Sequence, residues 1–182
     1  MSRTVDLCDW AADLARVQLV GLPQRWKHTQ AVARQAAHAR SIVDDPDLLV
    51  AAAWLHDIGY APNLVRTGVH AVDGAMFLAG LGAEDRLCGL VAHHSCACIE
   101  ARHQAVPIEW TDERTTLRDA LWWADMTTTP TGGVTEVRKR IDEVLDRYGP
   151  DHVVARSVSE SSAELISAAE RTERLLADLV QV

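Results

Sequence analysis

An adjacent histidine and aspartate, His56 and Asp57, have the clearest capacity for chemistry in this chain. A neutral imidazole and a carboxylate at one point can both bind a divalent cation. A His-Asp dipeptide is expected about this often by chance in a chain of this composition. The pair therefore indicates a metal site only if the surrounding sequence supports one. His28 precedes it, and His93 and Asp125 follow it. Two histidines with two aspartates form a mixed nitrogen and oxygen site, which suits divalent iron, manganese, zinc, cobalt or nickel rather than calcium.

The segments that carry these residues have the periodicity of helices. His28 lies near the start of one predicted helix, and His56 and Asp57 end the next one. That second helix contains the run LLVAAAWL, which is apolar on all sides and predicts a buried position. Because two helices joined by a short turn are antiparallel, His28 can meet His56. Asp125 likewise ends an apolar helix, in the run LWWAD.

Proline, glycine and capping residues divide the rest of the chain into further helices. Helices are predicted at about 5–20, 24–43, 47–57, 69–80 or 82, 84–94, 112–125, 134–148 and 159–180. Thr4 and Asp112 are the predicted caps of two of them. Residues 95–110 have weak periodicity and are expected to form a loop with at most a turn of helix. With no strand alternation and no internal repeat, the predicted fold class is all-α.

Composition narrows the possible functions. The net charge is −8 and the basic residues are scattered, so we expect no binding to duplex nucleic acid. A small anionic substrate is compatible with this charge, because a bound metal can invert the local potential. No apolar run is long enough to cross a bilayer and no secretory signal is apparent, so we expect no membrane partner and a cytoplasmic protein with reduced cysteines. A homo-oligomer is neither indicated nor excluded.

His28, the stretch AAAWLHDIGY around His56 and Asp57, and Asp125 after an aromatic helix together resemble the HD-domain superfamily of metal-dependent phosphohydrolases. The superfamily pattern is His…His-Asp…Asp on an α-helical scaffold. The resemblance implies that these four residues hold one divalent metal.

The same resemblance implies a single HD-type helical domain over residues 1–182. Its metal-binding core is expected at about 24–130, with the helices of 134–182 packed on it.

Further histidines bear on the number of metals. Dinuclear members of the superfamily hold a second ion with two more histidines, and the aspartate of the dyad bridges both ions. By this resemblance His70 and His93 are the second pair, with His94 as a substitute or an added contact. One or two ions are expected, and two are favoured because mononuclear members lack one or both histidines. Asp73, one helical turn after His70, is predicted to accept a proton, against the plainer interpretation of a solvent-facing aspartate.

The resemblance implies hydrolysis of a small phosphate ester, of which a nucleotide is one example, by a metal-activated water that Asp57 helps to orient. The alternatives are an HD-type diiron oxygenase and a metal-containing binding module without catalysis. The complete ligand set argues against the binding module. Residues 95–103 contain no lysine, which disfavours the phosphonate-cleaving oxygenases. Tyr60 stands where the cyclic-dinucleotide phosphodiesterases carry a lysine, and that subgroup is also disfavoured.

Overall fold

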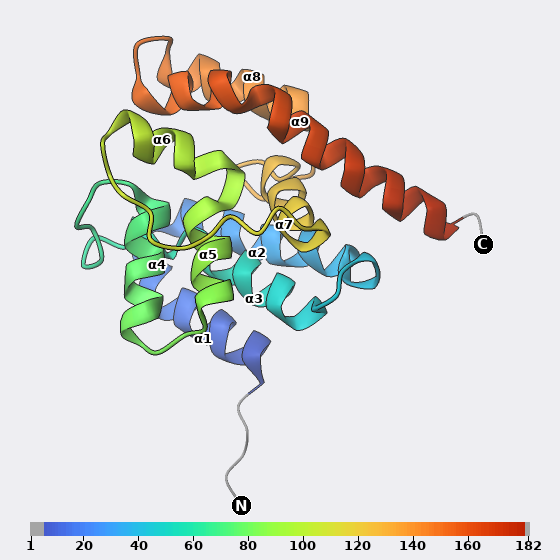
Figure 1. Ribbon diagram of the computed structural model, residues 1–182, viewed down its shortest axis with the longest axis horizontal. Coiled ribbons are helices and arrows are strands. Elements are labelled where there is room, and N and C mark those ends of the chain that lie inside the picture. Colours follow the sequence, from blue (N-terminus) through green and yellow to red (C-terminus); the bar gives the residue numbers. More distant parts are fainter. Residues whose placement is uncertain (1–5, 181–182) are drawn as a thin grey trace, which may run out of the picture.

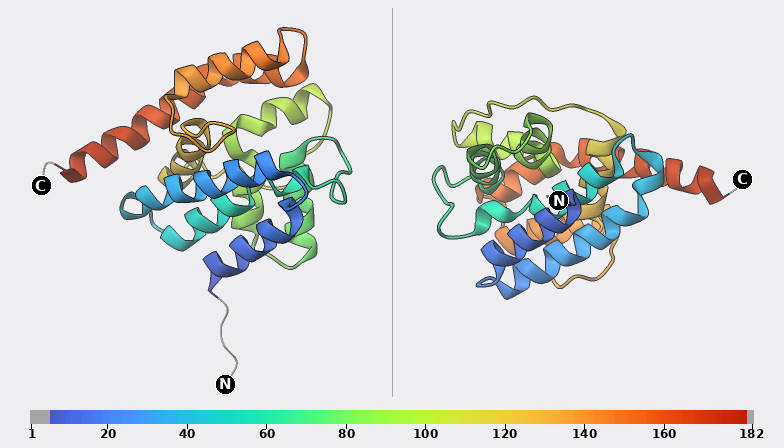
Figure 2. Two further views of the ribbon diagram at one scale, coloured as in Figure 1. Left: turned by 180° about the vertical axis from the view of Figure 1, so that it is seen from behind. Right: turned by 90° about the horizontal axis from the view of Figure 1, so that it is seen from below.

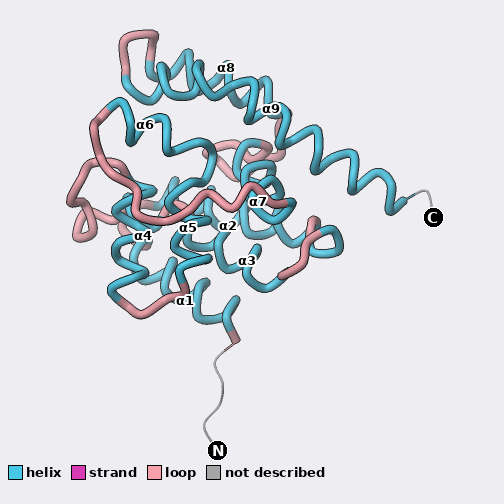
Figure 3. Tube along the Cα trace, in the orientation of Figure 1, coloured by secondary structure: helices cyan, strands magenta, loops and turns pink. Residues whose placement is uncertain are grey.

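The computed structural model describes residues 6–180 as a set of packed helices (Figure 1). The elements are α1 (Leu7–Leu19), α2 (Pro23–His38), η1 (Arg40–Ile42), α3 (Pro46–Leu55), η2 (Ile58–Tyr60), α4 (His70–Gly80), α5 (Asp85–His93), η3 (His94–Cys96), α6 (Ala97–His103), α7 (Thr116–Met126), α8 (Val137–Tyr148) and α9 (Val153–Val180), where η marks a short 3₁₀ helix. Helices joined by loops account for the whole described trace, in which no strand occurs (Figure 3). The predicted all-α class is confirmed.

α3 is the central helix of the fold. It packs against α1, α2, α5 and α7, and most of its side chains are buried. The Asp45 carboxylate accepts a hydrogen bond from the Leu48 N–H at 3.1 Å, and Pro46 occupies the first helical position. The surrounding apolar cluster extends along the chain from Ala11 in α1 to Ala169 in α9. The C-terminal end of this buried helix therefore carries its polar residues into the interior.

The two C-terminal helices form a hairpin on one side of the molecule. α8 and α9 pack on each other, and α9 also covers α6 and α7 (Figures 1 and 2). α9 has 28 residues, and its C-terminal part extends beyond the body of the molecule. None of the described helices combines the length and hydropathy needed to cross a membrane.

Three predicted segments differ from the structure. The segment expected to be mostly loop contains η3 and α6, whose few residues give too little sequence for a clear period. The final helix begins at Val153 and not at residue 159, because the short segment after Pro150 continues into it. The helix expected over 24–43 ends at His38 and is followed by the separate 3₁₀ turn η1.

The predicted caps also differ from those in the structure. Thr115 caps α7, and its hydroxyl group accepts the Arg118 N–H at 3.3 Å. Asp112 instead accepts a hydrogen bond from Arg118 Nη1 at 2.8 Å. Thr4 lies outside the described residues, and Asp6 caps α1 by accepting two backbone N–H groups. Because the Asp112 carboxylate pairs with the buried Arg118, it does not cap the N-terminus of α7.

Gly59 lets two elements approach at backbone distance. A Cβ atom at this position would lie 1.9 Å from the His70 carbonyl oxygen and 2.6 Å from the Gly74 nitrogen. Only a residue without a side chain permits this contact between η2 and α4. The contact sets the start of α4 beside the end of α3.

Candidate metal centre

Six side chains converge where several helices end or begin. They are His28 near the start of α2, His56 at the C-cap of α3, Asp57 before η2, His70 at the first position of α4, His94 after α5, and Asp125 near the end of α7, and together they are called the His–Asp cluster. All but His70 are buried, and His70 is half-buried. Residues at helix ends suit a shared polar site. The body of each helix stays packed in the core, while a side chain near its first or last turn points into the common interior.

Asp57 stands between two groups of histidines. Its Oδ2 atom lies 3.3 Å from His56 Nε2 and 3.9 Å from His28 Nε2. Its Oδ1 atom lies 3.5 Å from His70 Nε2 and 3.7 Å from His94 Nε2. One carboxylate therefore presents a different oxygen to each histidine pair.

Asp125 completes the first group. Its Oδ1 atom lies 2.9 Å from His28 Nε2 and 3.8 Å from His56 Nε2. Its Oδ2 atom accepts a hydrogen bond from the Ser95 hydroxyl group at 2.5 Å. One oxygen of Asp125 thus faces the histidines while the other is fixed by a neighbouring loop.

Backbone carbonyls fix the tautomer of three histidines. Nδ1 of His56 lies 2.7 Å from the carbonyl oxygen of Ala53, and Nδ1 of His94 lies 2.7 Å from that of Val91. Nδ1 of His28 is 3.1 Å from the Thr129 carbonyl oxygen. A carbonyl oxygen can only accept, so each Nδ1 carries a proton, and Nε2 is the nitrogen that can bind an ion. Histidines that bind metals in proteins are oriented by this kind of contact.

The geometry and the chemistry of the donors fit a divalent transition metal. Nε2 of His56 is buried and has no hydrogen-bond partner, although buried polar atoms are normally paired. His70 Nε2 and His94 Nε2 lie 3.2 Å apart. Two ligand atoms bound to one ion at about 2.1 Å each lie roughly 3.0–3.4 Å apart, close to the spacings found here. The two groups, His28 with His56 and Asp57, and Asp57 with His70 and His94, are each compact enough to hold an ion.

The electrostatics of the cluster favour positive charge beside the carboxylates. Burial raises the pKa of Asp57, but the charges of Arg25 and His56 outweigh it and hold the pKa well below its usual range. Burial lowers the pKa of His56, and the charge of Asp57 overcomes that effect and raises the pKa to about 9. Burial and the neighbouring His94 lower the pKa of His70 to about 3. His70 is thus held neutral, which is the form that binds a metal.

An arginine and a tyrosine adjoin the His–Asp cluster. Arg25 Nη1 donates a hydrogen bond to Asp57 Oδ2 at 2.6 Å, and its guanidinium lies 3.9 Å from the centre of the Tyr60 ring. The Tyr60 ring stacks on the His70 ring with centroids 4.0 Å apart. Arg25 precedes His28 by three positions, so both lie on the same face of α2. The three-residue spacing from His28 is the sequence feature that indicates a position for Arg25 beside the cluster.

Two residues expected at the site face elsewhere. The Nε2 atom of His93 lies 2.8 Å from the Trp110 carbonyl oxygen, so His94 and not His93 faces His70. Successive side chains at a helix end point in directions about 100° apart, and only one of the two can turn inward. Asp73 is buried, and its oxygens accept hydrogen bonds from the loop residues Thr67 and Gly68. It is therefore not solvent-facing, and its hydrogen bonds hold this loop in place.

Two cavities adjoin the cluster. A small one of about 100 Å³ is lined by Asp57, His70, His94 and Asp125 together with residues of α6, α8 and α9. A larger one of about 470 Å³ lies beside Arg25 and His28. The two cavities have lining residues in common and therefore adjoin.

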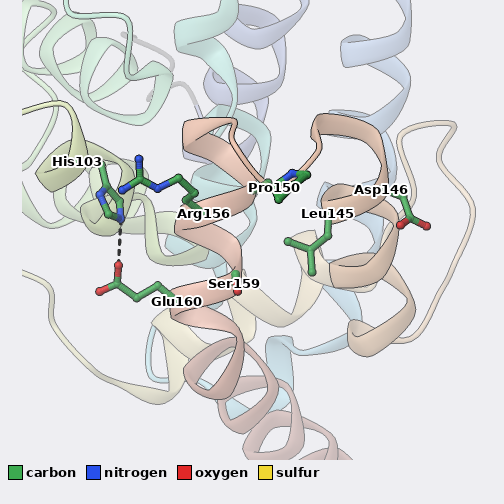
Figure 4. A pocket seen from close by; sticks show the side chains of 8 residues that line it. His103, Leu145, Asp146, Pro150, Arg156, Ser159 and Glu160 are labelled. Atoms are coloured by element: carbon green, nitrogen blue, oxygen red, sulfur yellow. Dashed lines mark hydrogen bonds and ion pairs between the residues drawn. The ribbon is translucent and has the colours of Figure 1, made fainter.

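A cavity of about 550 Å³, larger than either of these two, lies elsewhere (Figure 4). It is formed between α6, α8 and α9, where His103 faces Glu160 at 3.0 Å. It contains no residue of the His–Asp cluster. The volume of a cavity is thus a poor guide to the chemistry of this molecule.

Comparison with known proteins gives one match. The model of the family described as HD domain matches residues 25–175, which is more than half of the chain. No curated protein and no solved structure matches the chain. The matched range includes all six members of the His–Asp cluster, and also α8 and most of α9.

Proposed function

The chain belongs to the HD-domain family, and on that basis we propose that it is a metal-dependent phosphohydrolase that cleaves a small phosphate ester with water. A nucleotide is one candidate of this class. The observation that carries the proposal is the position of Asp57, with one oxygen toward His28 and His56 and the other toward His70 and His94. A carboxylate placed in this way suits a bridge between two ions.

In this proposal two divalent ions are held by the His–Asp cluster. His28, His56, Asp57 and Asp125 would hold the first, and Asp57, His70 and His94 the second. Divalent ions at such a site lower the pKa of water toward neutrality and offset negative charge on phosphate oxygens. His93 and Asp73 have no role in this assignment.

The remaining side chains of the small cavity position the substrate. The Arg25 guanidinium is already oriented by its stacking on Tyr60, and its planar fork matches phosphate oxygens. Apolar side chains of α8 and α9, Val144 and Val158, form another wall and limit the access of bulk water. These groups bind and orient the ester while Asp57 and Asp125 hold the cationic centre in place.

Glu100, and not Asp73, is the carboxyl group available for proton transfer in the small cavity, and it would act as a donor. It lines the small cavity, and its side chain is not among the proposed metal ligands. Burial raises the pKa of its carboxyl group, although His152 and Gln104 oppose this effect. A carboxyl group that keeps its proton at higher pH can donate it to the leaving-group oxygen.

Metal content and a substrate screen test the proposal. We expect two ions per chain in wild-type protein purified without chelators, none after Asp57→Ala, and one retained after His70→Ala. His38→Ala, which alters an exposed histidine outside the cluster, is expected to keep both ions.

Phosphomonoesters, phosphodiesters and nucleotides are then screened with and without added manganese. Metal-dependent release of phosphate, or of a phosphate monoester from a diester, is the expected result. A metal-free wild type contradicts the proposed site. Uptake of dioxygen by the iron-loaded protein without hydrolysis would favour the oxygenase instead.

A further inference from the structure

Three arginines line the cavities beside the cluster. Arg25, Arg140 and Arg147 border both the cavity of about 100 Å³ and that of about 470 Å³, as does Tyr60. No carboxylate lines the larger cavity, although the chain as a whole carries a net charge of −8. Positive charge is therefore gathered at one place in an acidic molecule.

Arg140 is unusual because it is buried and incompletely paired. Its exposed fraction is 8%, and its Nε atom is buried without a hydrogen-bond partner. Its Nη1 atom donates to Glu143, and Arg147 donates to the other oxygen of the same carboxylate. Glu143 thus holds both guanidinium groups, which lie about two turns apart on α8.

Burying a guanidinium is costly when its donors lack partners, and Arg140 Nε is closed off from any ligand, so an anion would stabilise Arg140 through the donors that line the cavity. The ligand must be an acceptor, because a guanidinium has donors only. Phosphate oxygens match the guanidinium fork in geometry and charge. The arrangement of Arg140 and Arg147 is that of an anion site beside the cluster and separate from it.

We propose that Arg140 and Arg147 bind a second phosphate of the substrate, one that is not hydrolysed. This inference rests on the proposed function, in which the first phosphate lies against the His–Asp cluster. Asp57 and Arg140 line the same small cavity, so one ligand in that cavity can place a phosphate group against each. The substrate class is then a phosphate ester with at least two phosphate groups. The cavity of about 470 Å³ accommodates the remainder of the molecule.

Binding of two phosphonates that cannot be hydrolysed tests this inference. The affinities of metal-loaded protein for methylphosphonate and methylenebisphosphonate are measured by calorimetry, and metal content is checked after each titration. We expect Arg140→Gln and Arg147→Gln each to weaken binding of the bisphosphonate by about 10-fold or more, the effect of losing a charge-assisted hydrogen bond. Binding of methylphosphonate should change by less than about twofold in both variants, because one phosphonate needs the cluster alone.

Arg138→Gln is the matched control. Arg138 lies on the same helix but is exposed and pairs with Glu170 at 3.1 Å, so its loss should leave both affinities unchanged. If Arg140→Gln does not fold, the inference is tested with Arg147→Gln alone. Arg147→Lys, which keeps the positive charge, should retain part of the affinity for the bisphosphonate.

Equal losses for both phosphonates, or no loss for either, overturn the inference. If the arginine variants lose affinity for the bisphosphonate alone but the protein hydrolyses no ester, the second-phosphate site is supported and the proposed reaction is refuted. If the protein hydrolyses esters but the arginine variants show no selective loss of bisphosphonate affinity, only the second-phosphate site is refuted.

Discussion

Ser95 adopts a backbone conformation that is rare for serine. Its φ and ψ angles are 47° and 41°, in the left-handed region, and Cys96 follows with a φ of 60°. Two such residues in succession carry strain that the surrounding structure must support. The result is a hydroxyl group that points at Asp125 Oδ2. Ser95 therefore positions a proposed ligand without belonging to the His–Asp cluster.

Replacement of Ser95 by alanine tests this positioning role. We expect Ser95→Ala to weaken metal binding by roughly 10- to 100-fold, the usual effect of losing a partner that orients a ligand. Competition with a chromogenic chelator measures the affinity. Ser162→Ala removes a half-buried hydroxyl group on α9 that bonds only the Ser159 carbonyl oxygen, and it should have no effect. Equal affinities for wild type and Ser95→Ala would show that Asp125 needs no such support.

Glu100 gives a prediction about pH. If its carboxyl group donates a proton, the activity is present while Glu100 is protonated and is lost as pH rises through its raised pKa. Glu100→Gln should lower kcat by roughly 100-fold and remove this alkaline limb from the pH profile. Initial rates across a pH series, with metal content verified, provide the measurement. A variant with an unchanged profile excludes Glu100 as the acid.

The residue types of the cluster could be predicted better than their directions. The spacing of His28, His56 and Asp57 along an antiparallel helix pair was enough to expect their meeting. The choice between His93 and His94 depends on the residue at which α5 ends, and a shift of one position rotates a side chain by about 100°. Sequence patterns locate helix ends less sharply than that.

At the scale of elements, the approach of η2 to α4 fixes how the two histidine groups face each other. Gly59 follows the dyad residue Asp57 by two positions and lies against the backbone of His70. The contact is backbone to backbone, so neither side can yield by changing a rotamer. The relative position of α3 and α4 thus depends on the absence of one Cβ atom.

Gly59→Ala is therefore expected to lower the free energy of unfolding by about 3 kcal/mol and to weaken metal binding at the second group. Urea denaturation of the metal-free protein measures the first effect. The matched control is Gly80→Ala on α4, where a Cβ atom meets nothing within 4 Å. That change should leave stability unaltered or raise it by up to about 1 kcal/mol. Similar results for the two variants would contradict the packing argument.

Long, well-capped helices were the predictable elements. α3 combines Asp45, Pro46 and a continuous apolar run, so its type and place follow from local physical chemistry. α6 was missed because its seven residues are held by burial of Ala97 and Ala101 against other helices, a tertiary effect with no local signature. The contribution of α8 to the cavities could not be predicted either, because it too depends on tertiary packing.

At the scale of the whole molecule, the His–Asp cluster joins five parts of the fold, namely α2, the α3–η2 junction, α4, the end of α5, and α7. An ion held there links these elements in the native state alone. Its binding energy therefore adds to the stability of the folded chain.

Removal of metal by a chelator should lower Tm, and readdition of manganese or iron should restore it. With free metal at 100 times its Kd, the stabilisation is about 2.7 kcal/mol for one site. Scanning calorimetry provides the measurement. Asp57→Ala should show no response to metal, while His38→Ala should respond as the wild type does. A metal response in Asp57→Ala would place the stabilising ion outside the cluster.

The separation of His28 and Asp125 along the chain has a consequence for biosynthesis. Their side chains are 2.9 Å apart although the two residues are 97 positions apart in the sequence. Asp125 leaves the ribosome several seconds after His28 at typical rates of about 5–20 residues per second. An ion that needs both residues as ligands could therefore be bound only after Asp125 has been synthesised, and until then His28 would lack this partner.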